Sequence, residues 1–196
     1  MRLIIFTRYP ETGNVKTRLI PALGEKGAEN LHREMVKQTI DQTLHYEYET
    51  EVHFTGGTIK LMKRWLGYHL TYRKQTGKSL GERLENAFKA AFAERKKKVI
   101  VIGTDCPDLT SAHVSKTFNL LSRSDLVLGP TFDGGYYLIG LKKLHGELFQ
   151  EISWGSEKVY LQTVKAANKL SLKTINLEKL ADIDRPADLK AWLNRK

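Results

Sequence analysis

Short runs of apolar residues alternate with longer amphipathic segments along the chain. The clearest run, Val99-Ile100-Val101-Ile102, is apolar at every position, which predicts a strand buried on both faces. Gly103 ends this run, and Pro107 prevents regular pairing beyond it. The same reasoning predicts strands over residues 2–7, 50–54, 69–72, 125–129, 136–141 and 172–177.

Apolar residues three or four positions apart predict helices between these strands. In the longest of them, Leu31, Met35 and Ile40 keep one apolar stripe near the period of 3.6 residues. The predicted helices cover residues 24–46, 58–66, 110–122, 144–152 and 156–168, with one more that opens at Ser79 and a last one from about Pro186 to Asn194. Because strands and helices alternate throughout residues 1–196, we predict a single α/β domain with a mostly parallel, mixed sheet flanked by helices.

Composition narrows the possible partners and environment. The chain has 32 Lys and Arg residues against 22 Asp and Glu, a formal net charge of +10, which favours anionic partners such as nucleotides. The densest basic run, residues 95–98, is interpreted as a solvated loop, because no pattern of a nucleic-acid-binding module accompanies it. Cys106 is the one cysteine, which precludes an internal disulfide and predicts a cytoplasmic location. No apolar run approaches the ~20 residues of a membrane helix.

A polar loop follows the first predicted strand and carries Arg8, Lys16 and Arg18 around Gly13. In doubly wound folds the first strand-to-helix turn is the usual phosphate-binding site. We therefore interpret the loop as a phosphate cradle, with a surface loop of scattered charge as the alternative.

Two aspartates are candidate metal ligands. Asp105 lies just beyond the strand over residues 99–102, where ligands gather in open α/β sheets, and carboxylate oxygens are the ligands that Mg²⁺ prefers. The alternative is that Asp105 caps the helix that begins near Thr110. Asp184, with Asp182 beside it, is either a second metal ligand or the cap of the helix at Pro186.

The segment Asp133-Gly134-Gly135 has two interpretations. Asp-Gly between strands is typical of a hairpin turn, while two glycines also let a backbone approach a ligand closely. In the second interpretation, Asp133 holds metal, binds sugar hydroxyls or acts as a base. Trp154 is interpreted as a core residue, with stacking on a sugar or base as the alternative, and Cys106 as a buried structural thiol.

Five motifs in order give the chain a family resemblance. They are FTRYPETGNVKTRL, GTDCPDL, LGPTFDGGYYLIGL, ISWGSEKVYLQT and DIDRPADL. Together they resemble a bacterial family of glycosyltransferase-A-like proteins, some of which are labelled arsenosugar-biosynthesis glycosyltransferases. The resemblance implies the nucleotide-diphospho-sugar transferase fold and kinship with nucleotidyltransferases.

The resemblance also implies roles for individual residues. The nucleotide phosphates would be held by Arg8, Gly13, Lys16 and Arg18. The base would be contacted by Gln75 together with Leu80 and Gly81. The divalent ion, Mg²⁺ or Mn²⁺, would be bound by Asp105, with Asp184 or else Asp182 as the second ligand.

These features predict a metal-dependent transferase that uses a nucleotide-activated donor and a small acceptor. Asp105 and Asp133 are the predicted catalytic residues, and Gly134, Gly135 and Trp154 are predicted to shape the sugar or acceptor pocket. Glycosyl transfer from a nucleotide sugar is the leading hypothesis. Nucleotidyl transfer from an NTP to a phosphorylated small molecule is the second, and nucleotide binding without turnover is the third. The sequence leaves the oligomeric state open, a homodimer included.

Overall fold

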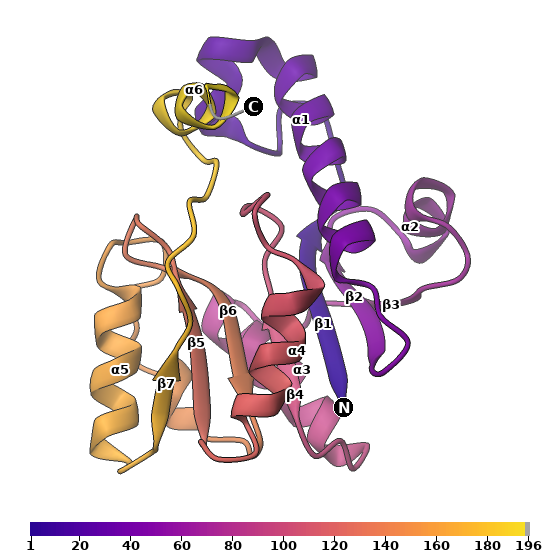
Figure 1. Ribbon diagram of the computed structural model, residues 1–196. Coiled ribbons are helices and arrows are strands. Elements are labelled where there is room, and N and C mark those ends of the chain that lie inside the picture. Colours follow the sequence, from indigo (N-terminus) through magenta and orange to yellow (C-terminus); the bar gives the residue numbers. More distant parts are fainter. Residues whose placement is uncertain (195–196) are drawn as a thin grey trace.

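The computed structural model describes residues 1–194 and contains one mixed β-sheet with helices on both faces (Figure 1). The strands are β1 (Arg2–Arg8), β2 (Glu49–Thr55), β3 (Thr71–Lys74), β4 (Val99–Ile102), β5 (Leu126–Pro130), β6 (Tyr136–Leu141) and β7 (Thr174–Asn176). The helices are α1 (Ile20–Thr43), α2 (Ile59–Leu66), α3 (Leu80–Ala93), α4 (Ser111–Leu120), α5 (Val159–Lys169) and α6 (Pro186–Leu193), with the short 3₁₀ turns η1 (Thr17–Leu19) and η2 (Gly146–Phe149). The predicted α/β fold with a mostly parallel, mixed sheet is confirmed.

The strand order is β3-β2-β1-β4-β6-β5-β7. β6 runs antiparallel to both of its neighbours, and every other pairing is parallel. From β1 the chain builds outward to β2 and β3 and then returns to add β4 on the other side. The carboxyl ends of β1 and β4 therefore flank the topological switch point, where open α/β sheets bind their ligands.

Alternate residues of the central strands pack into two separate cores. Leu3 and Ile5 belong to the core formed with α1, α2 and α4, whereas Ile4 belongs to the core formed with α3 and α5. Since side chains alternate across a strand, this division shows that β1 is covered on both faces. The same holds for β4, as predicted, because Ile100 and Ile102 belong to the first core and Val99 and Val101 to the second. None of the helices within residues 1–194 combines the length and the apolar character needed to cross a bilayer.

A third, smaller core lies beyond the edge of the sheet. In this core Leu19, just before α1, and Met35 of α1 pack with Ile183 and Leu189 of the C-terminal segment. Figure 1 shows α6 beside the first turns of α1, above the edge of the sheet at which β1 and β4 end. The C-terminal segment thus crosses that edge to reach its packing partner.

Several predicted elements differ in the structure. The strand predicted over residues 172–177 is the shorter β7, and the helix predicted over residues 156–168 begins at Val159. The helix predicted over residues 144–152 is wrong: only η2 forms, because Leu148 and Phe149 turn together into the core against α3 and Glu151 has a positive φ of 55°. The strand predicted over residues 69–72 begins two residues later. The helix predicted from residue 24 begins at Ile20, with a kink at Gly24, whose φ is 69°.

Buried charges join the amino ends of the strands to the end of α3. The Arg2 guanidinium is 4% exposed and donates to Glu49 at 2.8 Å and to Glu94 at 2.6 Å. It also lies 3.2 Å from the buried carboxylate of Glu51, which Arg73 contacts at 3.0 Å. Removing one member of such a network leaves an uncompensated charge in a site with little water.

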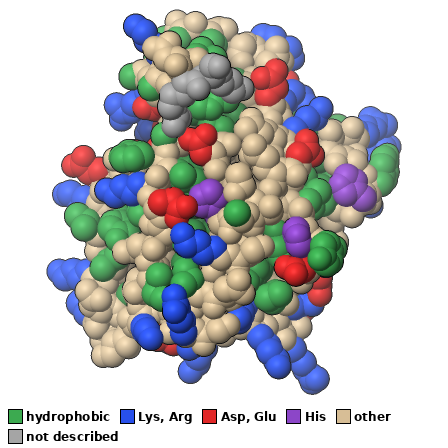
Figure 2. Space-filling model, in the orientation of Figure 1, with side chains coloured by type: hydrophobic (Ala, Val, Ile, Leu, Met, Phe, Trp, Pro, Cys, Tyr) green, Lys and Arg blue, Asp and Glu red, His purple; other side chains and the backbone are tan. Residues whose placement is uncertain are grey.

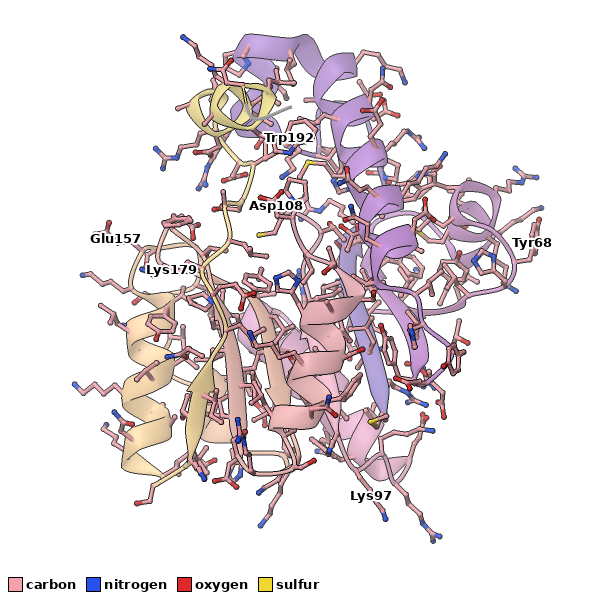
Figure 3. All side chains as sticks on the ribbon, in the orientation of Figure 1. Tyr68, Lys97, Asp108, Glu157, Lys179 and Trp192 are labelled. Atoms are coloured by element: carbon pink, nitrogen blue, oxygen red, sulfur yellow. The ribbon has the colours of Figure 1, made fainter. Side chains whose placement is uncertain are left out.

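We predict that Arg2→Ala lowers the free energy of unfolding by about 3 kcal/mol, because Glu51 stays buried with only Arg73 and His53 to offset its charge. The measurement is urea unfolding followed by circular dichroism. Lys97 is an exposed basic residue, labelled in Figure 3. Lys97→Ala is the matched control and should change the free energy of unfolding by less than about 0.5 kcal/mol. Equal stabilities for the two variants would contradict the prediction.

Candidate functional site

Three adjoining hollows line the edge of the sheet at which β1 and β4 end. The loop hollow, of about 350 Å³, lies between the β1–α1 loop and the ends of β4 and the C-terminal segment. The central hollow, of about 340 Å³, lies over the end of β4 and the start of β6, beside α3. The strap hollow, of about 870 Å³, lies between the β5–β6 turn, the start of α5 and residues 181–191. Residues 180–185, called the strap below, border all three.

The β1–α1 loop is held in one shape by a buried carboxylate. Glu29 is 2% exposed and accepts from Thr12 at 2.6 Å, from Lys26 at 2.9 Å and from Arg33 at 2.7 Å. These hydrogen bonds lower the pKa of Glu29 to about 2, so the carboxylate remains charged across the physiological range. This charged acceptor therefore ties the loop to α1 at Thr12.

Arg8 and Gly13 complete the loop. The Arg8 guanidinium donates to the carbonyl of Asn14 at 3.0 Å and lines the loop hollow. The Arg8 carbonyl lies 2.9 Å from Nε2 of His32, a buried histidine whose pKa is lowered by burial. Gly13 has a φ of 78°, a turn conformation that favours glycine, and it lies outside the lining of the three hollows.

Lys16 and Arg18, the other predicted phosphate contacts, are paired with the predicted metal ligands. The Lys16 ammonium is 4% exposed and lies 2.5 Å from Asp105 Oδ1 and 2.5 Å from the carbonyl oxygen of Ile183. Arg18 forms an ion pair with Asp184. The structure thus brings the basic loop and the two aspartates together, with each cation on a carboxylate.

Neither aspartate caps a helix. Thr110 is the N-cap of α4, with His113 as its reciprocal partner, and Asp105 takes no part in that cap. Arg185 occupies the N-cap position of α6, where Asp188 accepts its backbone N–H at 2.7 Å. The capping interpretations of Asp105 and Asp184 are therefore wrong, and both side chains face the hollows.

Asp133 does build the hairpin turn between β5 and β6. Its Oδ1 accepts from the Thr131 hydroxyl at 2.5 Å and from the Gly135 backbone N–H at 2.9 Å, while the carboxylate also lines the central and strap hollows. Gly134 has a φ of 88°, and a Cβ there would lie 2.2 Å from the carbonyl oxygen of Glu157. The turn therefore requires glycine at this position to pack against the start of α5.

Asp182 adds a further acidic group to the site. It is half-buried on the strap and lines both the central and the strap hollow. Burial, followed by the negative charges of Asp133, Asp188 and Asp105, raises its pKa to about 6. Negative charge is thus concentrated at the point where the hollows meet.

A hard divalent cation fits the chemistry of these donors, since carboxylate oxygens surround the meeting point. In the described part of the chain, no three His, Cys, Asp or Glu side chains form a ready metal site. Mg²⁺ commonly uses one or two carboxylates and takes its other oxygens from substrate phosphates and water. Asp105, with Asp184 or Asp182, satisfies that smaller requirement.

Gln75 and Gly81, the predicted base contacts, lie outside the lining of the hollows. The Gln75 amide donates to the carbonyls of Thr7 at 3.2 Å and His53 at 2.9 Å, so it joins the ends of β1 and β2. A Cβ on Gly81 would lie 2.6 Å from Nε1 of Trp154, so this glycine lets α3 approach that ring.

The aromatic wall of the central hollow is formed by Trp154 and Tyr136, whose rings meet edge to face with centroids 6.4 Å apart. Trp154 packs against the core of α3 and α5 and also lines the hollow, so both interpretations of this residue describe part of its surroundings. Leu80 and Leu84 of α3 line the same hollow, so Leu80, unlike Gln75 and Gly81, lies in its lining. Cys106 is buried, and burial raises the pKa of its thiol, as expected of a structural cysteine.

A bacterial protein family described as "Uncharacterized protein conserved in bacteria (DUF2064)" matches residues 39–156, more than half of the chain. The chain belongs to this family. A solved structure of a candidate nucleotide-diphospho-sugar transferase from Desulfovibrio desulfuricans G20 is 33% identical, with a TM-score of 0.93 over 97% of this chain and 85% of that one. The family resemblance seen in the motifs is confirmed.

More distant relatives are also transferases. A 2-phospho-L-lactate guanylyltransferase from Methanocaldococcus vulcanius is 24% identical over 95% of this chain and 82% of its own length. The 4-diphosphocytidyl-2C-methyl-D-erythritol synthase of Anaerococcus prevotii is 14% identical and shares the fold, with a TM-score of 0.65 over 99% of this chain and 96% of that one. The DUF2064 protein is thus a transferase of the nucleotide-transferase superfamily, as predicted.

The pKa of Glu29 predicts how pH changes the stability of the basic loop. Because the folded-state pKa, about 2, lies below the ordinary value of 4.5, the carboxylate stabilises the fold above pH 4.5 and loses this effect as pH falls toward 2. We expect Glu29→Gln to melt well below the wild type at pH 7, and the gap to close toward pH 2.5. Differential scanning calorimetry measures the gap, with the exposed Glu34→Gln as control. A gap that is constant with pH would contradict the prediction.

Proposed function

We propose that this DUF2064 protein is a divalent-metal-dependent glycosyltransferase that uses a nucleotide sugar as donor and a small molecule as acceptor. The observation that carries the proposal is the meeting of Lys16 and Arg18 with Asp105 and Asp184 at the switch point of the sheet. A diphosphate needs positive charge around it, and a bridging metal ion needs carboxylates beside that charge. The identity to a candidate nucleotide-diphospho-sugar transferase supports the same donor class.

The basic loop would bind the donor's diphosphate. Arg8, Lys16 and Arg18 line the loop hollow, and Glu29 fixes the shape of the loop that carries them. Lys16 is almost fully buried, so its attraction for a phosphate is weakly screened by water. On this proposal the same two cations that now neutralise the aspartates also hold the phosphates, once substrate is present.

Mg²⁺ or Mn²⁺ would be held by Asp105 together with Asp184, or with Asp182, whose carboxylate borders the same hollow. The ion would neutralise negative charge on the leaving nucleoside diphosphate. Asp133 and Gly135 line the same hollow, whereas Gly134 lies outside its lining, and Trp154 provides a surface for the sugar there.

Nucleotidyl transfer is a second candidate, favoured by the match to a guanylyltransferase along 95% of the chain. The two reactions release different products. Glycosyl transfer releases a nucleoside diphosphate, whereas nucleotidyl transfer releases pyrophosphate.

We predict that the protein releases UDP or GDP from a nucleotide sugar in a Mn²⁺- and acceptor-dependent manner, and releases no pyrophosphate from NTPs. Incubation with panels of nucleotide sugars and NTPs, followed by ion-exchange chromatography, separates the products. Pyrophosphate release from an NTP with a phosphorylated acceptor would replace the first candidate by the second.

Asp105→Asn should lower metal-dependent turnover by roughly a hundredfold, because an amide keeps the shape of the side chain but provides no charge for the cation. The melting temperature should also fall, because the buried Lys16 ammonium keeps an amide acceptor but loses its counter-charge, so turnover is compared at a temperature at which both proteins are folded. Asp41→Asn, an exposed change on α1, is the control. Unchanged turnover in Asp105→Asn would remove this residue from the mechanism.

Binding alone can be measured before a substrate is known. A nucleoside diphosphate at about 100 times its dissociation constant stabilises the protein by ~2.7 kcal/mol, or roughly 5–10 °C in a chain of this size. We expect this shift with UDP or GDP in the presence of Mn²⁺, and a much smaller one for Asp105→Asn. Equal shifts in both proteins would argue against a metal-assisted diphosphate site.

A further inference from the structure

The strap hollow extends away from the basic loop: of the three basic side chains Arg8, Lys16 and Arg18, only Arg18 lines it. At about 870 Å³ it holds more space than either of its neighbours, and it borders the central hollow through Asp133 and Asp182. A molecule in the strap hollow would therefore lie directly beside a donor that occupies the loop and central hollows. That position is suited to the second substrate of a transfer reaction.

Carboxylates outnumber basic side chains around the strap hollow, whereas basic side chains outnumber carboxylates around the loop hollow. Five carboxylates and three basic side chains line the strap hollow among the described residues. Asp184 forms an ion pair with Arg18, which leaves four carboxylates in the lining against the two basic side chains of Lys158 and Arg185. The loop hollow has three basic side chains, Arg8, Lys16 and Arg18, against two carboxylates.

This difference decides which substrate each hollow accepts. A diphosphate is stabilised in the loop hollow, whereas a phosphate group in the strap hollow would face several carboxylates at short range, which is unfavourable. Neutral hydroxyl groups, in contrast, can donate hydrogen bonds to carboxylates, and such charge-assisted bonds are strong.

An exposed aromatic ring stands at the rim of the strap hollow. Phe132 lies on the β5–β6 turn, is 71% exposed and lines the hollow. Lys179 lies 6.0 Å from the centre of its ring. Figure 3 shows Lys179 and Glu157 on the same side of the molecule, Lys179 on the segment after β7 and Glu157 at the start of α5. A ring face beside polar groups suits a compact ligand with an apolar and a hydroxylated surface.

We propose that the strap hollow is the acceptor subsite and that it selects a small polyhydroxylated acceptor without phosphate. This inference rests on the proposed glycosyl transfer. In that step an acceptor hydroxyl oxygen bonds to the anomeric carbon of the donor, and the bond from that carbon to the diphosphate oxygen breaks. The electron pair leaves with the nucleoside diphosphate, and the hydroxyl proton passes to water. Phe132 positions the acceptor ring, and Glu157 contributes to the exclusion of anions.

Saturation-transfer NMR tests the inference without turnover. The probes are glucose, glucosamine and glucose 6-phosphate, each at millimolar concentration with full-length protein, Mg²⁺ and GDP or UDP. We expect wild type to bind glucose or glucosamine and to bind glucose 6-phosphate at least threefold more weakly. Phe132→Ala should weaken the binding of the unphosphorylated sugars at least threefold. Glu157→Lys should strengthen glucose 6-phosphate binding by roughly threefold, because reversal of one charge removes repulsion and adds attraction.

Two controls make the test specific. Glu151→Lys changes the same charge at an exposed position that does not line the strap hollow, and it should leave all three affinities unchanged. The melting-temperature shift with UDP or GDP and Mg²⁺ should be the same in wild type, Phe132→Ala and Glu157→Lys, because none of these changes touches the basic loop.

Three results would overturn the inference: no sugar binding to wild type, tighter binding of glucose 6-phosphate than of glucose and glucosamine, or affinities that Phe132→Ala and Glu157→Lys leave unchanged. If the nucleotide shift persists, such a result rejects only the acceptor subsite. Loss of the nucleotide shift with retained sugar binding would instead count against the proposed donor.

Discussion

The organisation of the site depends on one buried ammonium group. Lys16 Nζ lies between the carboxylate that follows β4 and a carbonyl of the strap, so three segments far apart in the sequence meet at a single charge. The Ile183 N–H completes the arrangement by donating to the Asp105 carbonyl at 2.9 Å. Because a buried ammonium without partners is costly, the fold is constrained to keep the loop, the strand end and the strap together.

The sheet supplies the fixed positions from which these segments extend. Its order reverses beside β1, so the β1–α1 loop and the β4 end emerge as neighbours with a crevice between them. On the face shown in Figure 2, Lys and Arg side chains are spread around the outline and do not form one patch. Specific attraction for an anion is therefore a property of the crevice and less of the net charge of +10.

Most of the fold followed from local patterns in the sequence, but contacts across the fold did not. Val99–Ile102 and the apolar stripe of α3, formed by Leu84, Ala87, Phe88 and Ala91, each have a single consistent interpretation, since propensity and periodicity agree there. The helix prediction over residues 144–152 failed because the apolar residues there pack in a compact turn against α3. Such a turn leaves no periodic pattern in the sequence. Asp105 and the basic loop could be placed at the site from strand ends alone. The hydrogen bonds from Gln75 to two backbone carbonyls depend on how the ends of β1 and β2 meet. The place of Leu80 and Leu84 in the lining of the central hollow depends on how α3 sits on the sheet.

Because β6 runs antiparallel to β5, a short turn is enough to connect the two strands. A parallel successor to β5 would need a crossover of a dozen or more residues, but here residues 131–135 suffice, and they stay at the edge where the hollows lie. A short turn between two paired strands can change its residues or length at small entropic cost while the pairing holds its ends in place. Molecules with the same sheet and the same basic loop can therefore acquire different second substrates through a few positions in one hairpin.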